Sequence, residues 1–338
     1  MVVASLKVRP EAPGRERFGG SMKPRLVFVH GIGGLRDPVA EQDSWLSALA
    51  AGACDAGHER WAPELRHGRA TDTRFAYYGN LFHRDQKQGD DGDGADDADL
   101  VGELLLAAVD ERLSEPTTED TWRVLRRARA QLAPEGSPQG PGAAARQVLT
   151  AANTLLGLPG LSAFGRWASA GLMVGQLRQV ARYLRRGEED ERGLTLDSRI
   201  RRCIEQALDS SGPTIVIAHS LGTVVSMETL HGYRGDLRLL ITLGSPIGMG
   251  AAVRPRMRPQ PLRVPDSVER WLNFWDRDDL VAARPRLENS LLPSGTGVLP
   301  VTMRVDSDGM WVHPATKYLA HAAVAGPVAE AIQRATTG

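Results

Sequence analysis

The chain has 338 residues, of which 42% are hydrophobic and 24% are charged, a composition typical of globular proteins with one or two domains. Lys and Arg together number 41, as do Asp and Glu, so no excess of charge indicates a nucleic-acid partner. Two cysteines, Cys54 and Cys203, are too few for a disulfide framework. We therefore expect a reducing compartment, the cytoplasm.

Residues 1–22 contain Arg, Pro and Gly but lack the apolar centre of a signal peptide. We expect a disordered leader there, with Met22 as an alternative start of the protein. The sequence has no uninterrupted apolar run of about 18 residues, which a membrane-spanning helix would need.

Six short runs rich in apolar and β-branched residues predict strands. Most are continuous rather than alternating, a pattern typical of strands that are buried on both faces of a parallel sheet. The runs cover residues 25–31, 73–81, 213–220, 237–245, 270–276 and 298–306. Apolar residues at helical spacing predict helices around 45–53, 196–208 and 324–332. This alternation of strand and helix predicts a doubly wound α/β sheet.

Residues 83–192 interrupt the alternation and predict an insertion in a core formed by 23–82 and 193–338. The insertion opens with the acidic stretch 89–99, which predicts a solvated loop. A calcium-binding loop is the alternative, but the EF-hand spacing fails at Ala95 and no Glu occupies the closing position.

The rest of the insertion is helical in pattern. A polar helix is expected around 121–132, followed by a linker rich in Pro and Gly at 133–142. Residues 143–186 are rich in Leu, Ala and Gly, and one apolar stripe lies beside several arginines. The stripe consists of Met173, Leu177, Val180 and Leu184.

The stretch TIVIAHSLGTVV, at 214–225, places Ser220 between a predicted strand and a predicted helix. The pattern small-x-Ser-x-Gly is typical of a nucleophile held on a sharp turn, where neighbours must be small because strand and helix nearly touch. Ala218 stands where the first glycine is usual, and alanine is nearly as small. A buried serine that caps the helix is the alternative interpretation.

A second motif, VHGIGG at 29–34, follows the first predicted strand. Acyl transfer through a serine needs two N–H donors for the negative oxygen of the intermediate, and the N–H of Leu221 is one candidate. A glycine-rich turn after an earlier strand would supply the other. A dinucleotide fingerprint is the rival interpretation, but Arg36 occupies the place of its third glycine.

Together, VHGIGG and AHSLG resemble the motifs of the α/β-hydrolase superfamily, in its serine esterase and lipase branch. The later stretches LITLGSPIG and WLNFWDRDDLVA resemble a wider group of bacterial serine-esterase-like hydrolases. The resemblance implies a minimal hydrolase fold of about six mainly parallel strands, with Ile32 giving the second N–H of the oxyanion hole. It extends over the sheet strands and the last 130 or so residues, but not over 83–192.

The family order of nucleophile, acid and histidine implies that the acid follows the run 270–276. Asp276, Asp278 and Asp279 are available, and Asp279 with Val281 fits the family pattern Asp-x-Val best. Asp276 matches an upstream acid that more often shapes the loop. The acid would orient the histidine and stabilise its charged form.

Two histidines follow the last predicted strand. His313 begins the segment HPATKYL, which resembles the family's segment around its histidine, and it would act as the general base. His321 is expected inside or beside the final helix. We expect His30 and His219 to support turns, and neither a metal nor a cofactor is indicated.

The sequence and the resemblance predict a cytoplasmic serine hydrolase that cleaves carboxylic esters through an acyl-enzyme. Acyltransferase, thioesterase and cyclase activities use the same triad and stay open, as does a binding module that kept the fold without catalysis. Helices of 143–186 are expected to form a lid over the pocket. A helical hairpin packed on the sheet, a dimer contact, or a lipid contact through the apolar stripe are alternatives.

Overall fold

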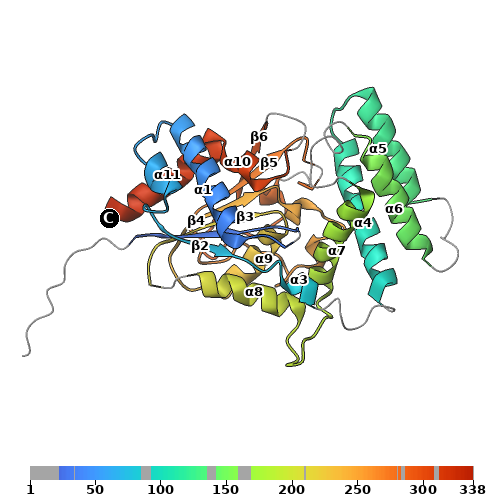
Figure 1. Cartoon of the computed structure of the whole chain (residues 1–338), viewed down its shortest axis with the longest axis horizontal. Coiled ribbons are helices and arrows are strands. Elements are labelled where there is room, and N and C mark those ends of the chain that lie inside the picture. The colour runs from blue at the N-terminus through green and yellow to red at the C-terminus, as the bar shows by residue number, and fades with distance from the viewer. Residues whose placement is uncertain are drawn as a thin grey trace, which may run out of the picture.

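The computed structural model gives the fold in Figure 1. It describes residues 23–33, 35–84, 93–134, 142–158, 169–208, 211–279, 281–282, 286–307 and 312–337. The leader that we expected at 1–22 lies outside the described residues.

One six-stranded sheet forms the centre of the protein, and every pairing in it is parallel. The strand order is β2-β1-β3-β4-β5-β6. The strands are β1 (Arg25–Val29), β2 (Asp72–Ala76), β3 (Thr214–His219), β4 (Leu237–Leu243), β5 (Trp271–Asp276) and β6 (Val301–Val305). Five of them lie within one of the six apolar runs, and β2 overlaps its run but begins one residue earlier, at Asp72, so the expected α/β class and parallel sheet are confirmed.

The central strands are mostly apolar because helices cover both faces of the sheet. All six residues of β3 are buried, as are the last four of β1. In the register of this pair, Val29 lies opposite Ala218. The two strands therefore end level with each other, and the loops that follow them start side by side.

Helices pack on both faces of the sheet (Figure 1). On one face lie α1 (Pro38–Asp55), α10 (Ala315–Leu319) and α11 (Ala322–Thr337), and on the other lie α8 (Leu196–Ala207) and α9 (Leu221–Leu230). The shorter elements are α2 (Ala62–Arg66), α3 (Leu81–Arg84), and the 3-10 turns η2 (Pro246–Gly248), η3 (Arg254–Arg256) and η4 (Leu287–Asn289).

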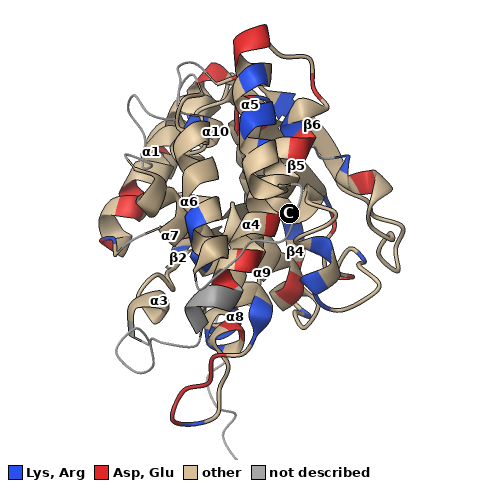
Figure 2. Ribbon diagram, turned by 90° about the vertical axis from the view of Figure 1, so that its right-hand side faces the viewer, with Lys and Arg blue, Asp and Glu red and all other residues tan. Residues whose placement is uncertain are grey.

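The insertion folds into four helices that pack on one another beside the sheet (Figure 1). They are α4 (Asp93–Leu113), α5 (Glu119–Leu132), α6 (Ala143–Leu155) and α7 (Ala170–Arg185). We call these four helices the inserted bundle. Acidic and basic residues are interspersed among the described residues of its outward face (Figure 2).

The expected loop at 89–99 is wrong for residues 93–99, which belong to α4. Acidic residues are stabilising in the first turns of a helix because the N-terminal end of the helix dipole is positive. The carboxylate of Asp97 also forms an ion pair with Arg185 of α7, at 3.1 Å. Residues 85–92 lie outside the described part of the chain.

The apolar stripe of α7 faces the protein interior. Its four residues are at most 6% exposed and join the core that also contains Ile32, Leu221 and Ile247. The inserted bundle and the edge of the sheet therefore share one hydrophobic core. The stripe is therefore not exposed for the lipid contact that we gave as an alternative, and a lipid contact through 143–186 stays a prediction.

Among the described residues, no helix combines the length and the apolar character that a bilayer crossing requires.

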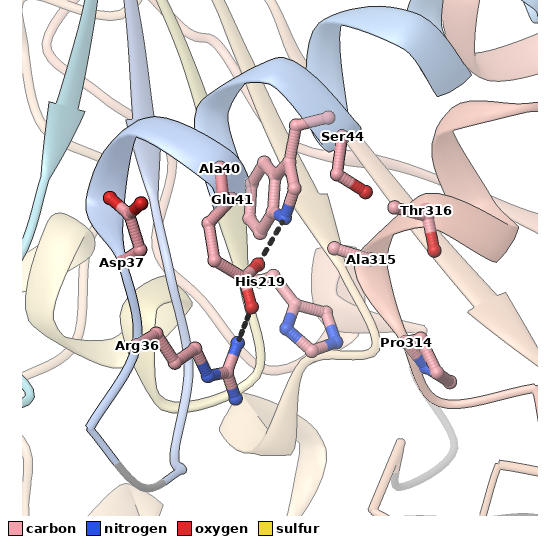
Figure 3. Close-up of a pocket in the computed structure, with 10 residues that line it drawn as sticks. Arg36, Asp37, Ala40, Glu41, Ser44, His219, Pro314, Ala315 and Thr316 are labelled. Carbon is pink, nitrogen blue, oxygen red and sulfur yellow. Dashed lines mark hydrogen bonds and ion pairs between the residues drawn. The ribbon is translucent and has the colours of Figure 1, made fainter.

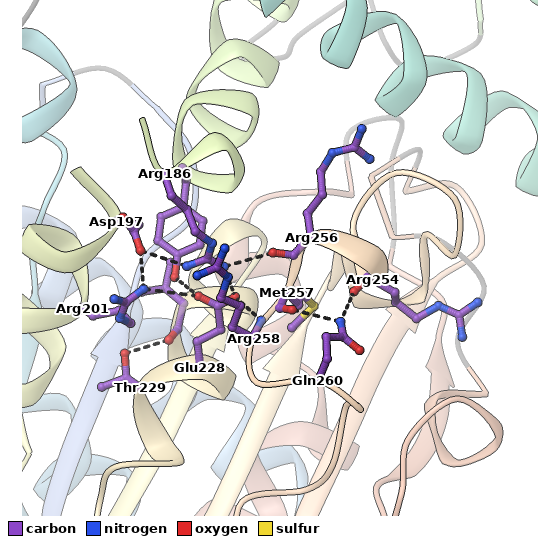
Figure 4. Close-up of polar contacts among 12 residues, drawn as sticks. Arg186, Asp197, Arg201, Glu228, Thr229, Arg254, Arg256, Met257, Arg258 and Gln260 are labelled. Carbon is purple, nitrogen blue, oxygen red and sulfur yellow. Dashed lines mark hydrogen bonds and ion pairs between the residues drawn. The ribbon is translucent and has the colours of Figure 1, made fainter. Parts of the chain in front are cut away.

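A buried ionic cluster fixes α7, α8 and α9 to one another at the end of α9 that is remote from Ser220 (Figure 4). Glu228 of α9 accepts hydrogen bonds from Tyr183 at 2.6 Å and from the guanidinium of Arg186. Asp197 of α8 pairs with the same Arg186, at 2.8 Å, and with Arg201, at 2.5 Å. Both carboxylates are nearly inaccessible, so this pairing offsets a large desolvation cost.

Glycine at position 222 is required by the close approach of α9 to β1. An added Cβ would lie 2.7 Å from the carbonyl oxygen of Val29 and closer still to that of His30. Backbone atoms cannot move aside as a flexible side chain can, so even one methyl group overpacks this contact.

We therefore expect Gly222→Ala to lower the free energy of unfolding by about 1–3 kcal/mol. Gly175→Ala is the matched control, because the Cβ would meet nothing within 4 Å in α7 and alanine favours a helix over glycine by up to about 1 kcal/mol. Urea unfolding of both variants measures the difference. Equal destabilisation by the two substitutions would contradict the steric account.

Candidate active site

Ser220 lies at the apex of the turn from β3 to α9. Its φ of 53° and ψ of −129° are rare for a residue with a side chain, and such strain persists only where the surrounding structure imposes it. Leu243 helps to hold Ser220 in this conformation, because the carbonyl of Leu243 accepts a hydrogen bond from the N–H of Ser220 at 3.0 Å. The serine is 1% exposed, and its hydroxyl has no hydrogen-bond partner among the described residues.

Small residues surround this turn, as the motif predicts. A Cβ on Gly31 would lie 2.5 Å from the Cβ and 3.1 Å from the Oγ of Ser220. The loop after β1 therefore passes directly over the serine. This contact brings the two glycine motifs of the sequence together at the carboxyl edge of the sheet.

Asp279 and His313 form a buried pair at the same edge. The Nδ1 of His313 lies 2.9 Å and 2.8 Å from the two carboxylate oxygens of Asp279. Tyr318 of α10 donates its hydroxyl to Asp279 at 2.7 Å, and the backbone N–H of Val281 donates at 3.0 Å. The carboxylate is thus fixed in place and directed at the ring of His313.

The electrostatics of this pair favour an ionised acid. Burial alone would raise the pKa of Asp279, but the nearby His313 and the hydrogen bonds from His313, Tyr318 and Val281 hold it below its usual value. Burial and the neighbouring carboxylate raise the pKa of Tyr318 well above 10, so this phenol stays a proton donor.

Gly244 lies beneath the pair at a φ of 53°, in the left-handed region. A Cβ there would lie 2.8 Å from the Oδ2 of Asp279 and 3.5 Å from the Nδ1 of His313. Both the backbone conformation and the space therefore require glycine. This glycine belongs to the motif LITLGSPIG, whereas no local pattern in the sequence predicts a role for Tyr318.

The other acidic and histidine candidates have different partners. Asp276 accepts the N–H groups of Asp278, at 2.9 Å, and of Ser307, at 2.6 Å, so it shapes the loops after β5 and β6. Asp278 is largely exposed and pairs with Arg112 of α4 at 3.2 Å. His321 precedes α11, and its Nε2 lies 3.1 Å from the hydroxyl of Ser307.

His219 connects the serine turn to His313. Its Nε2 lies 2.7 Å from the carbonyl oxygen of His313, and since a carbonyl only accepts, the proton resides on Nε2. The two rings are 4.7 Å apart between centroids. Burial lowers the pKa of His219 well below 6.5, so it is a neutral structural donor, as we expected for this residue.

His30 supports the loop after β1 in a similar way. Its Nε2 accepts the N–H of Tyr78 at 3.1 Å, which leaves the ring proton on Nδ1 to be donated to the carbonyl of Gly31 at 2.6 Å. Burial lowers the pKa of His30 to about 3. A neutral imidazole thus fixes the backbone that covers Ser220.

The N–H groups of Ile32 and Leu221 donate no hydrogen bond to other described residues. Leu221 is the first residue of α9, where backbone N–H groups have no partner within the helix. Both residues are buried, so a negatively charged oxygen held by these groups would be shielded from water.

Gln179 of the inserted bundle holds the loop that contains Ile32. Its side-chain amide accepts the N–H of Gly33 and donates to the carbonyl of Gly33, each at 2.9 Å. Arg36 donates to the carbonyl of Ile32 at 3.0 Å. Sequence reasoning missed Gln179, because a glutamine on a helix of an insertion carries no local signal of contact with a loop 146 residues earlier.

A cavity of about 300 Å³ borders the side chain of His219, between the start of α1 and residues 314–316 (Figure 3). Arg36, Asp37 and Glu41 contribute charged groups to its wall, and Arg36 and Glu41 form an ion pair at 2.8 Å.

Among the described residues, no group of three or more His, Cys, Asp or Glu side chains could hold a metal ion. Comparisons of the chain with protein-family models, with curated proteins and with solved structures find no match. The motifs and the geometry of the site are therefore the basis for a proposal of function.

The buried neutral histidines make stability depend on pH. Because His30 and His219 have depressed pKa values when folded and ordinary ones when unfolded, only the unfolded chain takes up their protons as pH falls below about 6.5. We expect the free energy of unfolding to fall between pH 6.5 and 4.5, approaching about 1.4 kcal/mol per pH unit for each histidine.

Urea unfolding at several pH values measures this slope. His219→Gln keeps a donor to the carbonyl of His313 but cannot titrate. It should therefore reduce the slope by the contribution of one histidine, about 1.4 kcal/mol per pH unit. His67→Gln is the control, because His67 is exposed, and it should leave the slope unchanged. A wild-type free energy that stays constant between pH 6.5 and 4.5 would refute the assignment.

Proposed function

We propose that the protein is a serine hydrolase of the α/β-hydrolase type that cleaves carboxylic esters through an acyl-enzyme. Ser220 is the nucleophile, His313 the general base, Asp279 the acid that orients it, and the N–H groups of Ile32 and Leu221 the oxyanion hole.

The observation that carries the proposal is the conformation of Ser220. A serine with φ of 53° at a strand–helix turn, buried and without a hydrogen-bond partner among the described residues, is costly to maintain. A serine that only capped the helix would use its hydroxyl for that purpose, whereas Ser220 makes no side-chain capping bond to α9. The strain and the unused hydroxyl support a reactive role.

The hydrogen bonding between Asp279 and His313 gives further support to the proposal. The carboxylate accepts from Nδ1, so the neutral imidazole carries its proton there and presents Nε2 as the basic nitrogen. In the proposed reaction, the Oγ of Ser220 attacks the ester carbonyl while its proton passes to Nε2. The ionised Asp279 stabilises the imidazolium that results.

The tetrahedral intermediate then collapses. The bond to the alkoxide breaks, and the imidazolium of His313 gives its proton to the departing oxygen. Water repeats the sequence on the acyl-enzyme and releases the carboxylic acid with Ser220 restored. Two N–H donors aimed at the developing oxyanion would each contribute about 10²–10³ in rate.

Active-site labelling tests the proposed nucleophile. A fluorophosphonate should label the wild type, because attack by Ser220 forms an O–P bond and expels fluoride. Ser220→Ala should abolish both labelling and turnover of p-nitrophenyl esters. Ser226→Ala is the matched control, since Ser226 is another buried serine of α9 with an unbonded hydroxyl, and it should label as the wild type does.

A folded wild type that the fluorophosphonate leaves unlabelled would overturn the proposed hydrolase and favour a binding module.

The acid can be identified by three matched substitutions. Asp279→Asn should lower kcat by about 10⁴-fold, because the amide favours the wrong tautomer of His313. Asp276→Asn removes a loop contact, so it should lower the melting temperature with a much smaller loss of kcat. Asp278→Asn should change neither strongly, since Asp278 is exposed.

Melting curves and ester turnover of the three variants decide the assignment. A loss of kcat at Asp276→Asn that equals the loss at Asp279→Asn would remove the distinction between the two acids.

A further inference from the structure

The inserted bundle contacts three loops near the carboxyl edge of the sheet. Gln179 bonds to Gly33 in the loop after β1, and Arg112 pairs with Asp278 in the loop after β5, at 3.2 Å. Glu103 pairs with Arg256 of the segment after β4, at 2.8 Å. The last two pairs are exposed in part, but the contact of Gln179 is buried.

The contact between Gln179 and Gly33 resembles a rung of a β-ladder. One amide donates to the carbonyl and accepts from the N–H of the same residue, so both distances of 2.9 Å depend on one side-chain orientation. Gln179 is 9% exposed, and water therefore does not compete for these bonds. Rotation or loss of the side chain would leave two backbone groups of Gly33 unpaired.

The rest of the loop is held by residues that are close to it in the sequence. His30 donates to the carbonyl of Gly31, and Arg36 donates to that of Ile32. At Gly33, by contrast, the backbone of this loop is held by Gln179, which belongs to the inserted bundle. The N–H of Ile32 lies between these anchors and donates to no other described residue.

We propose that Gln179 is a positioning residue for the oxyanion hole, so that the inserted bundle takes part in catalysis without touching substrate. This inference rests on the proposed hydrolase function. Gln179 holds the N–H and the carbonyl of Gly33, and Gly33 follows Ile32 directly, so a shift of Gly33 moves the backbone that carries the N–H of Ile32. The carbonyl of Gly31, in the same peptide group as that N–H, is held by His30. An oxyanion donor is effective only within about 2.7–3.1 Å of the charged oxygen, so a small shift of this loop costs rate.

The test compares the rate of fluorophosphonate labelling in the wild type, Gln179→Ala and Arg182→Ala. A misplacement of about 1 Å can cost about 100-fold in rate, so we expect Gln179→Ala to slow labelling and to lower kcat by about 10–100-fold with little change in KM.

Arg182→Ala is the control for loosening α7. Arg182 donates to both oxygens of Glu188, at 2.6 Å each, and to the carbonyl of Phe82 at 2.8 Å, and neither of these partners belongs to the loop at 31–36. Its loss should lower the melting temperature at least as much as Gln179→Ala does, with a labelling rate near that of the wild type.

Gln179→Glu separates positioning from simple packing. An ionised carboxylate accepts the N–H of Gly33 but repels its carbonyl, whereas a protonated carboxyl has the same shape and can donate to that carbonyl. Burial favours the neutral acid. The labelling rate of Gln179→Glu, divided by that of the wild type, should therefore rise as pH falls. If the side chain at position 179 only fills space, this ratio should not change with pH.

The outcomes distinguish the two proposals. If the wild type is labelled and Gln179→Ala is labelled equally fast, or if Arg182→Ala is slowed as much as Gln179→Ala, the positioning role is wrong and the hydrolase proposal stands. If the folded wild type is not labelled at Ser220, the hydrolase proposal fails and the role of Gln179 fails with it.

Discussion

The parallel pairing of β1 with β3 is the constraint on which the site depends. Because Val29 lies opposite Ala218, the two strands end level, and the loop after β1 begins beside the turn at Ser220. Gly31 and Gly222 allow the two loops to approach so closely that neither position has room for a side chain. The strained turn at Ser220 and the N–H groups of Ile32 and Leu221 lie at this edge, and the loops after β5 and β6 bring Asp279 and His313 to it.

Neutral buried groups then stabilise the edge. Burial disfavours a second ring proton on His30 and His219, and each donates its one ring N–H to a backbone carbonyl. The buried Asp279 accepts from Tyr318 and from a backbone N–H, which compensate for its burial. The site therefore combines an ionised carboxylate with neutral donors held in place, an arrangement that suits the stabilisation of charge as it develops.

The sequence predicted those features that depend on local patterns. Continuous apolar runs located all six strands, and the small residues around Ser220 located the strained turn. The resemblance favoured Asp279 over Asp276 and His313 over His321. In the structure Asp279 and His313 contact each other, whereas Asp276 and His321 both bond to Ser307. The acidic stretch 93–99 was assigned wrongly, because composition alone does not reveal that Asp97 meets arginines of a distant helix. Gln179 and Tyr318 act through tertiary contacts, which no local pattern reports.

The separation of β1 from β3 along the chain also has a consequence for how the protein is made. Val29 ends β1 and Thr214 begins its central neighbour, so a ribosome adding about 5–20 residues per second needs on the order of 10–40 s to supply the partner. Until then β1, which is apolar after Arg25, lacks the strand that will cover one of its edges. The helices of the intervening segment contact one another and can form in that interval, so the nascent chain has a local structure to complete before its sheet can close.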